Sequence, residues 1–380
     1  MLSCKMEKSL ETLLSKCEIP IIDLEHAVAG TDACPMKSVI MRVGAQLQKA
    51  LSQKGLALLV NHGIPEEKLT KVYSTLDKFC DLPGEVKEKY LRNSEHGNHG
   101  YVKPGMEMFD GETPEIRHTY NICTLATDGL PEDVLPGFRA SIASLAADFK
   151  QLSTLLLQSL AIGLELPSNF FLERHGQMLN DNDDNATTLR LLYYPPCISE
   201  EDAEIDYVKG SCGYEKYDRR PSQMNCLSES IDQVDSMNVT RCGAHCDYGT
   251  FTLLAQDSEG GLEVKLPHTE RWQRVGHLPG AILINTGELL AAWTQERYPA
   301  LPHRVIIPEH NIRNKGRHAI AFFCHPDNCT PIAPLDLPEE QCPFQKPCKK
   351  TTKEQFRHAK DRVFTAYQHL QKRFRETYAS

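Results

Sequence analysis

The 380-residue sequence lacks any apolar run long enough to cross a membrane. Charged residues interrupt every apolar stretch in its first thirty positions, so these contain neither the hydrophobic region of a signal peptide nor a membrane span. Basic residues are not clustered, and with a formal charge of −9 they give no electrostatic footprint for nucleic acid or an anionic membrane. These absences predict a cytoplasmic protein whose partner is a small molecule.

The sequence also lacks internal repeats, low-complexity tracts and any sign of a disulfide framework. In a reducing compartment its 14 cysteines are better explained as free thiols that pack as small hydrophobic side chains. With 41% hydrophobic residues, the chain has the composition of a globular protein that buries one large core or two smaller ones.

The first half of the sequence is dominated by helical periodicity. Apolar residues spaced by three or four positions predict helices at about 35–55 and 65–79, with a buried strand at 56–60 after the first. A longer apolar stripe predicts a spine helix at 138–162 that lies under a sheet.

From Thr188 the pattern changes to short apolar runs broken by Gly and Pro, which predicts an all-β sandwich or jelly roll. Residues 198–240 interrupt these runs with a polar, acidic insertion. Its lack of periodicity favours a disordered or plain surface loop over an ordered lid. Helical spacing from Lys353 onward predicts a C-terminal helix that packs on the β core.

Two potential metal ligands stand one residue apart in the segment AHCDYG at 244–249. Because strand side chains alternate, we expect His245 and Asp247 on one side at the head of a strand, with Cys246 pointing away. An H-x-D pair alone is a weak signal, since an ordinary histidine explains it more often.

A third ligand has to come from elsewhere, and His303 opens another predicted strand further along the chain. Two histidines and a carboxylate form a facial triad that leaves about three coordination positions open, as Fe(II) oxygenases require. The sequence therefore predicts a mononuclear iron site made by His245, Asp247 and His303.

A zinc cluster of Cys242, His245 and Cys246 is the rival interpretation of this segment. It has a geometric difficulty, because adjacent residues of an extended segment face opposite sides. No second Cys or His pair follows at the matching spacing.

Further motifs occur in order along nearly the whole chain. The N-terminal part contains IPIIDL at 19–24, GLALLVNHGI at 55–64 and GY at 100–101; the C-terminal part contains YYPPC at 193–197, HCDYG at 245–249, GGL at 260–262, NTGE at 285–288, WT at 293–294 and HRV at 303–305. Together they resemble the isopenicillin N synthase-like group of iron- and 2-oxoglutarate-dependent dioxygenases.

The resemblance implies a mainly β fold with α-helices: a double-stranded β-helix, or jelly-roll, core flanked by an α-helical N-terminal region and a C-terminal helix. We accordingly expect an N-terminal leader region at 1–125 and an oxygenase core at 126–350, which contains the spine helix and the insertion. The C-terminal helix is expected at 351–380.

The family's Arg-x-Ser carboxylate anchor is matched by Arg317, but its serine position holds Ala319. Arginine suits this role because its planar fork engages a carboxylate through two hydrogen bonds and stays charged. The missing hydroxyl is worth on the order of 1–3 kcal/mol if nothing replaces it. Tyr194 resembles the family's tyrosine near the other end of 2-oxoglutarate, although a barrel-wall aromatic explains it equally well.

The resemblance also implies Fe(II) as cofactor, 2-oxoglutarate as co-substrate and dioxygen as reactant, with ascorbate as a candidate reductant. A small-molecule substrate would be hydroxylated or otherwise oxidised while succinate and CO2 are released, and no catalytic residue beyond the metal site is implied. Nothing in the sequence identifies that substrate.

Three other functions stay open. An iron oxidase of the same fold that does not use 2-oxoglutarate would retain the same arginine. A zinc hydrolase could use two histidines and a carboxylate, although the chain has no His-Glu-x-x-His motif. A catalytically silent binding protein is the third, for which Ala319 is the only hint.

Overall fold

The computed structural model describes residues 19–25, 27, 37–92, 97–108, 115–126, 129–180, 184–196, 240–267, 272–307, 316–337 and 363–377. Nearly all of the expected insertion at 198–240 lies outside these residues. The same holds for 351–362 of the expected C-terminal helix and for the start of the helix expected at 35–55.

The N-terminal elements follow the predicted order. α2 (Lys37–Lys54) ends where Gly55 adopts a left-handed φ of 72°, and β2 (Leu56–Val60) follows directly and pairs in parallel with β1 (Ile21–Asp23). α3 (Glu66–Cys80) begins after Pro65, as predicted. Two short helices complete this part: α4 (Gly84–Lys87) and η1 (Glu88–Tyr90).

A large sheet joins strands from both halves of the chain. Its order is β1-β2-β10-β7-β12-β5-β4-β3, and all neighbours except β1 and β2 are antiparallel. The further bounds are β3 (Gly100–Val102), β4 (His118–Ile122), β5 (Thr188–Tyr194), β7 (Phe251–Gln256), β10 (Ile282–Thr286) and β12 (Arg317–Cys324). The periodicity predicted the sheet in the second half, but four of its strands come from the first.

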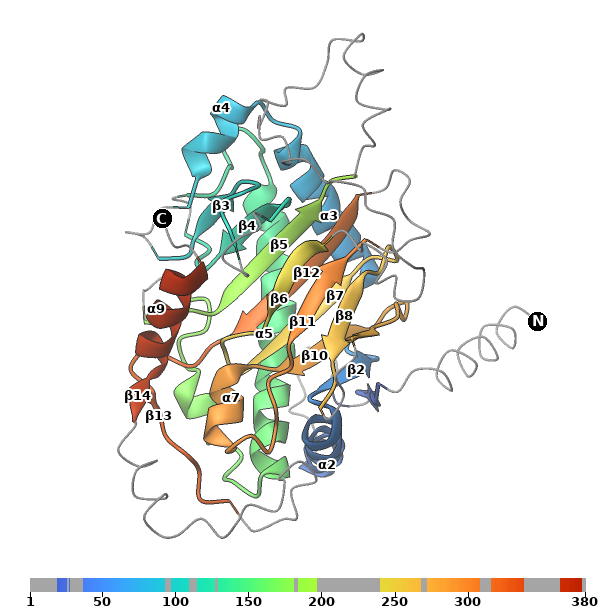
Figure 1. Ribbon diagram of the computed structural model, residues 1–380, viewed down its shortest axis with the longest axis vertical. Coiled ribbons are helices and arrows are strands. Elements are labelled where there is room, and N and C mark those ends of the chain that lie inside the picture. Colours follow the sequence, from blue (N-terminus) through green and yellow to red (C-terminus); the bar gives the residue numbers. More distant parts are fainter. Residues whose placement is uncertain are drawn as a thin grey trace, which may run out of the picture.

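A second sheet covers one face of the first (Figure 1). Its order is β6-β11-β8-β9, with bounds β6 (Thr240–His245), β8 (Leu262–Lys265), β9 (Trp272–Arg274) and β11 (His303–Ile306). A cluster of buried apolar side chains lies between the two sheets and includes Leu58, Leu192 and Leu283 from the large one with Val264 and Val305 from the small one. The two-sheet barrel predicted from the sequence is therefore present.

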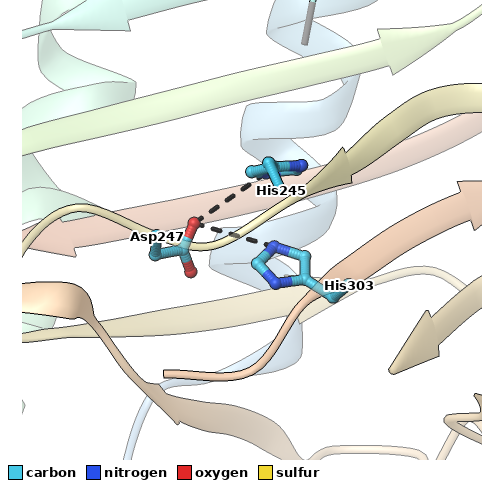
Figure 2. Close-up of side chains that lie close together, drawn as sticks. All are labelled: His245, Asp247 and His303. Carbon is cyan, nitrogen blue, oxygen red and sulfur yellow. Dashed lines mark ion pairs between the residues drawn. The ribbon is translucent and has the colours of Figure 1, made fainter. Parts of the chain in front are cut away.

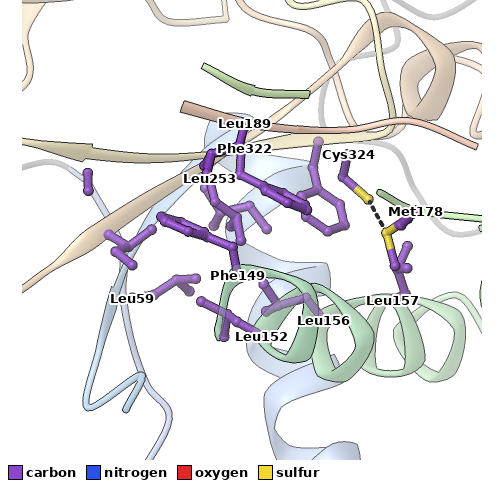
Figure 3. Close-up of a cluster of buried hydrophobic side chains, with 14 of the residues drawn as sticks. Leu59, Phe149, Leu152, Leu156, Leu157, Met178, Leu189, Leu253, Phe322 and Cys324 are labelled. Atoms are coloured by element: carbon purple, nitrogen blue, oxygen red, sulfur yellow. Dashed lines mark hydrogen bonds between the residues drawn. The ribbon is translucent and has the colours of Figure 1, made fainter. Parts of the chain in front are cut away.

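The opposite face of the large sheet packs on α5 (Phe138–Gly163), the predicted spine helix. Along β12, Ala319 and Ala321 face the barrel cavity whereas Phe322 faces the helix, where its ring stacks on Phe149 at 5.6 Å (Figure 3). Burial of each such aromatic side chain contributes roughly 1.5–3 kcal/mol, so the helix gives the cavity wall a rigid support.

The C-terminal helix is shorter than the sequence predicted. β13 (Pro331–Ile332) pairs with β14 (Phe364–Thr365), and α9 (Ala366–Thr377) begins only after that strand. The helical spacing from Lys353 onward predicted Val363, Tyr367 and Leu370 on the packed face. Leu370 is buried as predicted, but Val363 and Tyr367 are exposed, because the helix begins only at Ala366. Two further short helices are η3 (Leu172–Arg174) and α7 (Glu288–Trp293).

α9 is held against the barrel by ionic contacts with α7. The carboxylate of Glu288 accepts hydrogen bonds from Arg373 and from His369 Nε2 at 2.8 Å. Among the described residues, no helix combines the length and apolar character needed to cross a membrane.

Candidate metal and co-substrate site

The two histidines of the predicted triad face each other across paired strands of the small sheet. His303 on β11 pairs in register with His245 on β6, and their ring centroids lie 4.3 Å apart. One detail of the prediction is wrong: β6 ends at His245, so Asp247 lies in the loop after the strand and not at the strand's head. The apolar run that suggested a strand follows Asp247 and forms β7, whereas the strand that pairs with β11 lies before Asp247.

All three predicted metal ligands point to one place (Figure 2). The Nε2 atoms of His245 and His303 lie 4.0 and 3.7 Å from Oδ1 of Asp247, and one ligand atom from each residue lies within 4.8 Å of the others. Bonds of about 2.0–2.2 Å from one ion to nitrogen and oxygen can bridge such separations with small side-chain adjustments. In the described part of the chain, no other group of three or more metal-binding side chains is as close.

Backbone carbonyls fix which nitrogen of each histidine is available. Nδ1 of His245 lies 2.9 Å from Gly243 O, and Nδ1 of His303 lies 3.1 Å from Leu301 O. Since a carbonyl only accepts, Nδ1 carries the proton and Nε2 keeps its lone pair toward Asp247. Burial and the neighbouring His303 lower the pKa of His245 to about 3, so its ring is neutral and able to bind a metal.

Asp247 is buried and ionised. Burial alone would raise its pKa, but His303, His245 and a hydrogen bond from Asn285 together lower it. Asn285 Nδ2 donates to Oδ2 at 2.6 Å, which leaves Oδ1 toward the histidines. Asn285 belongs to the NTGE motif, which was recognised in the sequence without a role for this residue.

The glycine of the HCDYG motif allows this loop to pack tightly. A Cβ atom on Gly249 would lie 2.5 Å from Cys324 O, and one on Gly287 would lie 2.2 Å from Gly249 O. The amide of Glu288 at the start of α7 then donates to Asp247 O at 2.8 Å. Two close backbone approaches therefore hold Asp247 in place.

The rival zinc cluster is not assembled. Cys242 Sγ lies 3.9 Å from Nδ1 of His245, on the side away from Asp247, and accepts a hydrogen bond from Arg117 Nη1 at 3.0 Å. Burial raises the pKa of Cys242 to about 12, so the thiol is protonated. Cys246 Sγ instead donates to Ala300 O at 3.8 Å.

Arg317 lies in the same cavity as the triad and is 1% exposed. Its Nε donates to Gly260 O at 2.8 Å and its Nη2 donates to Gln256 Oε1 at 3.0 Å, which fixes the plane of the guanidinium. Among the described residues, no carboxylate forms an ion pair with Arg317 and no group accepts a hydrogen bond from Nη1. A buried cation without a counter-ion is suited to an anionic ligand.

Tyr194 was expected near the other end of 2-oxoglutarate, but it is the cross-strand neighbour of Arg317, and its ring centroid lies 5.0 Å from the guanidinium carbon. Its hydroxyl accepts a hydrogen bond from Arg117 Nη1 at 3.2 Å, so its own proton can point elsewhere. Ala319 lines the cavity beside Arg317 and pairs with Gln256, so no hydroxyl is present where the family pattern has serine.

A buried ionic cluster at one end of this cavity was missed from the sequence. Glu107 accepts from Arg117 Nη2 at 2.8 Å and pairs with Arg190 Nη2 at 3.1 Å. Glu115 lies 4.0 Å from Arg117, and its pKa is raised by burial although Arg117 opposes this. Arg190 within the apolar run TLRLLYY was the signal available in the sequence, but its partners lie in a separate segment.

Two family models match this chain. The 2OG-Fe(II) oxygenase superfamily matches residues 186–326, which contain the triad, and the non-haem dioxygenase in morphine synthesis N-terminal family matches residues 19–136. The first match spans the strands that line the cavity, and the second spans most of the helical leader and β1 to β4.

Individual proteins agree with the models. A Schizosaccharomyces pombe protein of the UPF0676 group is 29% identical over 335 residues, covering 85% of this chain and 86% of its own. The 2-oxoglutarate-dependent dioxygenase frbA of a Dothideomycetidae species is 28% identical over 325 residues, with coverages of 77% and 83%.

A solved structure confirms the double-stranded β-helix fold. A full-length Neurospora crassa protein, solved in complex with alpha-KG, matches with a TM-score of 0.67 at 24% identity, covering 95% of this chain and 96% of that one. With the family matches and the triad in one cavity, the chain belongs to the iron- and 2-oxoglutarate-dependent dioxygenases, oxidoreductases that use Fe(II) and 2-oxoglutarate to oxidise a small molecule.

Proposed function

We propose that His245, Asp247 and His303 bind the Fe(II), and that Arg317 and Tyr194 bind the distal carboxylate of 2-oxoglutarate. One observation supports this most: three converging ligand atoms and a buried arginine without an acidic partner among the described residues line the same cavity. When bound, the iron and 2-oxoglutarate supply the oxidising chemistry, and 2-oxoglutarate ends as succinate and CO2.

The protein's own part is to orient the co-substrate and to exclude water. Gln256 and Gly260 hold the fork of Arg317 so that Nη1 is directed to the ligand. Arg117 donates to the hydroxyl oxygen of Tyr194, which makes the phenol proton available to a carboxylate oxygen. The remaining wall is largely apolar and includes Leu192, Leu254, Leu262, Leu283 and Leu301.

We also propose a reducing, cytoplasmic location, a small-molecule substrate and no nucleic-acid partner. The six cysteines that the structure describes are all free, and the acidic chain has no basic cluster. We keep the division into a leader at 1–125, a core at 126–350 and a C-terminal segment at 351–380 as a proposal.

The test measures succinate formed from 2-oxoglutarate by protein loaded with Fe(II) without air and then exposed to dioxygen. Wild-type protein is expected to form succinate, whereas His245→Ala and Asp247→Ala fall to background because a ligand is lost. Cys246→Ser serves as the control, since its side chain bonds Ala300 and not the triad. Full activity with zinc under anaerobic conditions would contradict the proposal.

An oxidase that does not consume 2-oxoglutarate is the alternative function, and Arg317 does not decide between the two, because such an oxidase would retain the same arginine. Carboxyl-labelled 2-oxoglutarate separates the two functions. Release of labelled CO2 with substrate oxidation supports the first, and oxidation of substrate with iron and dioxygen but without succinate supports the second.

A further inference from the structure

A second cavity adjoins the triad and shares His245 and Asp247 with the barrel cavity. It encloses about 430 Å³, including the part open to solvent. Strands and α9 both contribute to its wall, which includes Asn98, Arg190, His325, Leu370 and Phe374. A molecule bound there would lie directly beside the metal-binding side chains.

His325 in this wall is 6% exposed, yet its ring has no hydrogen-bond partner among the residues that the structure describes. Its backbone is fixed, because its N donates to Thr187 Oγ1 at 3.1 Å and its O accepts from Asn185 Nδ2 at 3.0 Å. The ring nitrogens are not among the fully buried polar atoms without a partner, and His325 lines the cavity, so a molecule bound there can form a hydrogen bond with this ring.

His175 shows the contrast. This histidine is equally buried, but its Nδ1 bonds Phe171 O at 2.6 Å and its Nε2 bonds Thr250 Oγ1 at 2.8 Å. Burial lowers the pKa of His325 to about 3 and that of His175 to about 4, so both rings are neutral. The two rings differ in their hydrogen bonds: within the described residues, both nitrogens of His175 have a partner and those of His325 have none.

Arg190 lines the same cavity, and its guanidinium is held in place from two sides. Asn121 Oδ1 accepts from its Nε at 2.7 Å, and Glu107 lies 3.1 Å from its Nη2. The two carboxylates of Glu107 and Glu115 lie within ion-pair distance of the guanidinium groups of Arg117 and Arg190, so the formal charges of these four residues cancel. A neutral ligand group can therefore bind beside this guanidinium without adding an uncompensated buried charge, which a carboxylate would add.

We propose that this cavity binds the organic substrate, and that the substrate is a small neutral ring whose carbonyl oxygen is recognised by Arg190 and whose polar edge is recognised by His325. Phe323 and Phe374 in the wall favour a flat ring over a flexible chain. The inference rests on the proposed function, because it places the substrate beside the iron ligands.

The test uses the anaerobic Fe(II)–2-oxoglutarate complex, whose visible charge-transfer band responds to occupation of the neighbouring site. The probes are 2-pyridone, 2-piperidone and cyclohexanone, with benzoate and cyclohexanecarboxylate as matched anions. We expect at least one neutral ring to shift the band of the wild-type protein and the anions to leave it unchanged.

Variants then locate the binding. His325→Leu and Arg190→Lys are expected to weaken the effective ring about tenfold, as the loss of one hydrogen bond predicts. His325→Leu should fold, since its ring has no partner within the described protein, and His325→Asn should recover part of the affinity. His175→Leu is the matched control: it lowers the melting temperature and keeps the ring affinity within about twofold.

The outcomes separate the two proposals. A wild-type protein that forms no charge-transfer band would overturn the proposed function and this inference together. A normal band that no neutral ring shifts, that only the anions shift, or that responds equally in His325→Leu and wild type would overturn the inference and leave the proposed function standing.

Discussion

Arg317 and the Arg117–Arg190 pair line one cavity, are all buried and nevertheless meet opposite electrostatic surroundings. Arg317 is held by two neutral acceptors and no acid, whereas Arg117 and Arg190 share Glu107 and have Glu115 nearby. A buried arginine therefore does not by itself mark an anion site. The ion pair decides, and only the Arg317 end lacks an ion-paired acid among the described residues.

Asp257 lies near Arg317 but is bonded to His318. Asp257 accepts from the backbone N of His318 at 2.5 Å and lies 3.5 Å from His318 Nδ1, while His318 Nε2 bonds Asp77 at 2.7 Å. Asp257 is therefore bonded to His318 and forms no ion pair with Arg317, although Arg317 also lowers the pKa of Asp257. The paired end stabilises the fold and has its charges compensated, whereas the unpaired end is suited to an anionic ligand.

The largest expected effect is on the paired end. Arg117→Leu removes an ion-pair partner from Glu107 and the nearby cation from Glu115, so the free energy of unfolding is expected to fall by about 3–5 kcal/mol. Urea titration followed by circular dichroism measures this loss. A variant as stable as wild type would show that the cluster is not a structural one.

The next effect is on the unpaired end. Arg317→Leu is expected to weaken 2-oxoglutarate about hundredfold, since two charge-assisted hydrogen bonds to a carboxylate are lost. Its stability should stay near that of wild type, because no acid is left unpaired. Succinate formation at varied 2-oxoglutarate concentration gives the KM.

Arg304→Leu is the matched control for Arg317→Leu. Arg304 also lies on a barrel strand but pairs with Glu263 at 2.9 Å outside the cavity, so its removal should not change the KM. Equal KM values for Arg317→Leu and wild type would assign the carboxylate to another residue.

A smaller effect is expected at Ala319, beside Arg317. Ala319→Ser restores a hydroxyl beside Arg317 and is expected to lower the 2-oxoglutarate dissociation constant about fivefold, as one added hydrogen bond of about 1 kcal/mol predicts. Titration of the anaerobic iron complex measures it. Weaker binding in the serine variant would mean that the alanine methyl packs against the native ligand.

The smallest effect concerns His318, which pairs with Asp257 near the Arg317 end. Burial lowers the pKa of His318, but hydrogen bonds to Asp257 and Asp77 outweigh burial and raise it. Since the folded pKa lies above the unfolded one, this stabilisation is complete below about pH 6.5 and is lost as pH rises through the folded pKa.

His318→Gln should therefore cost up to about 1 kcal/mol at about pH 6 and progressively less toward about pH 9. Urea titrations of both proteins across this range measure the difference. A cost that does not change with pH would place the effect in ring packing against Tyr193, which stacks on His318 at 4.9 Å.

Much of the candidate site could be predicted because it depends on local pattern. The spacing of His245 and Asp247, the apolar strands that carry His303 and Arg317, and Gly55 at the end of α2 are features of short segments. Where the local pattern was ambiguous, the prediction was wrong: Asp247 lies beyond its strand, and α9 begins at Ala366.

The sequence by itself predicted the fold class, the candidate ligand set and the candidate arginine anchor, because alternation and motif order record them along the chain. Only the tertiary structure decided which buried arginine has no ion-paired acid and which buried histidine ring has no hydrogen-bond partner among the described residues. Glu107, Arg190 and His325 come from three separate segments, and their pairing depends on distances that no local pattern records.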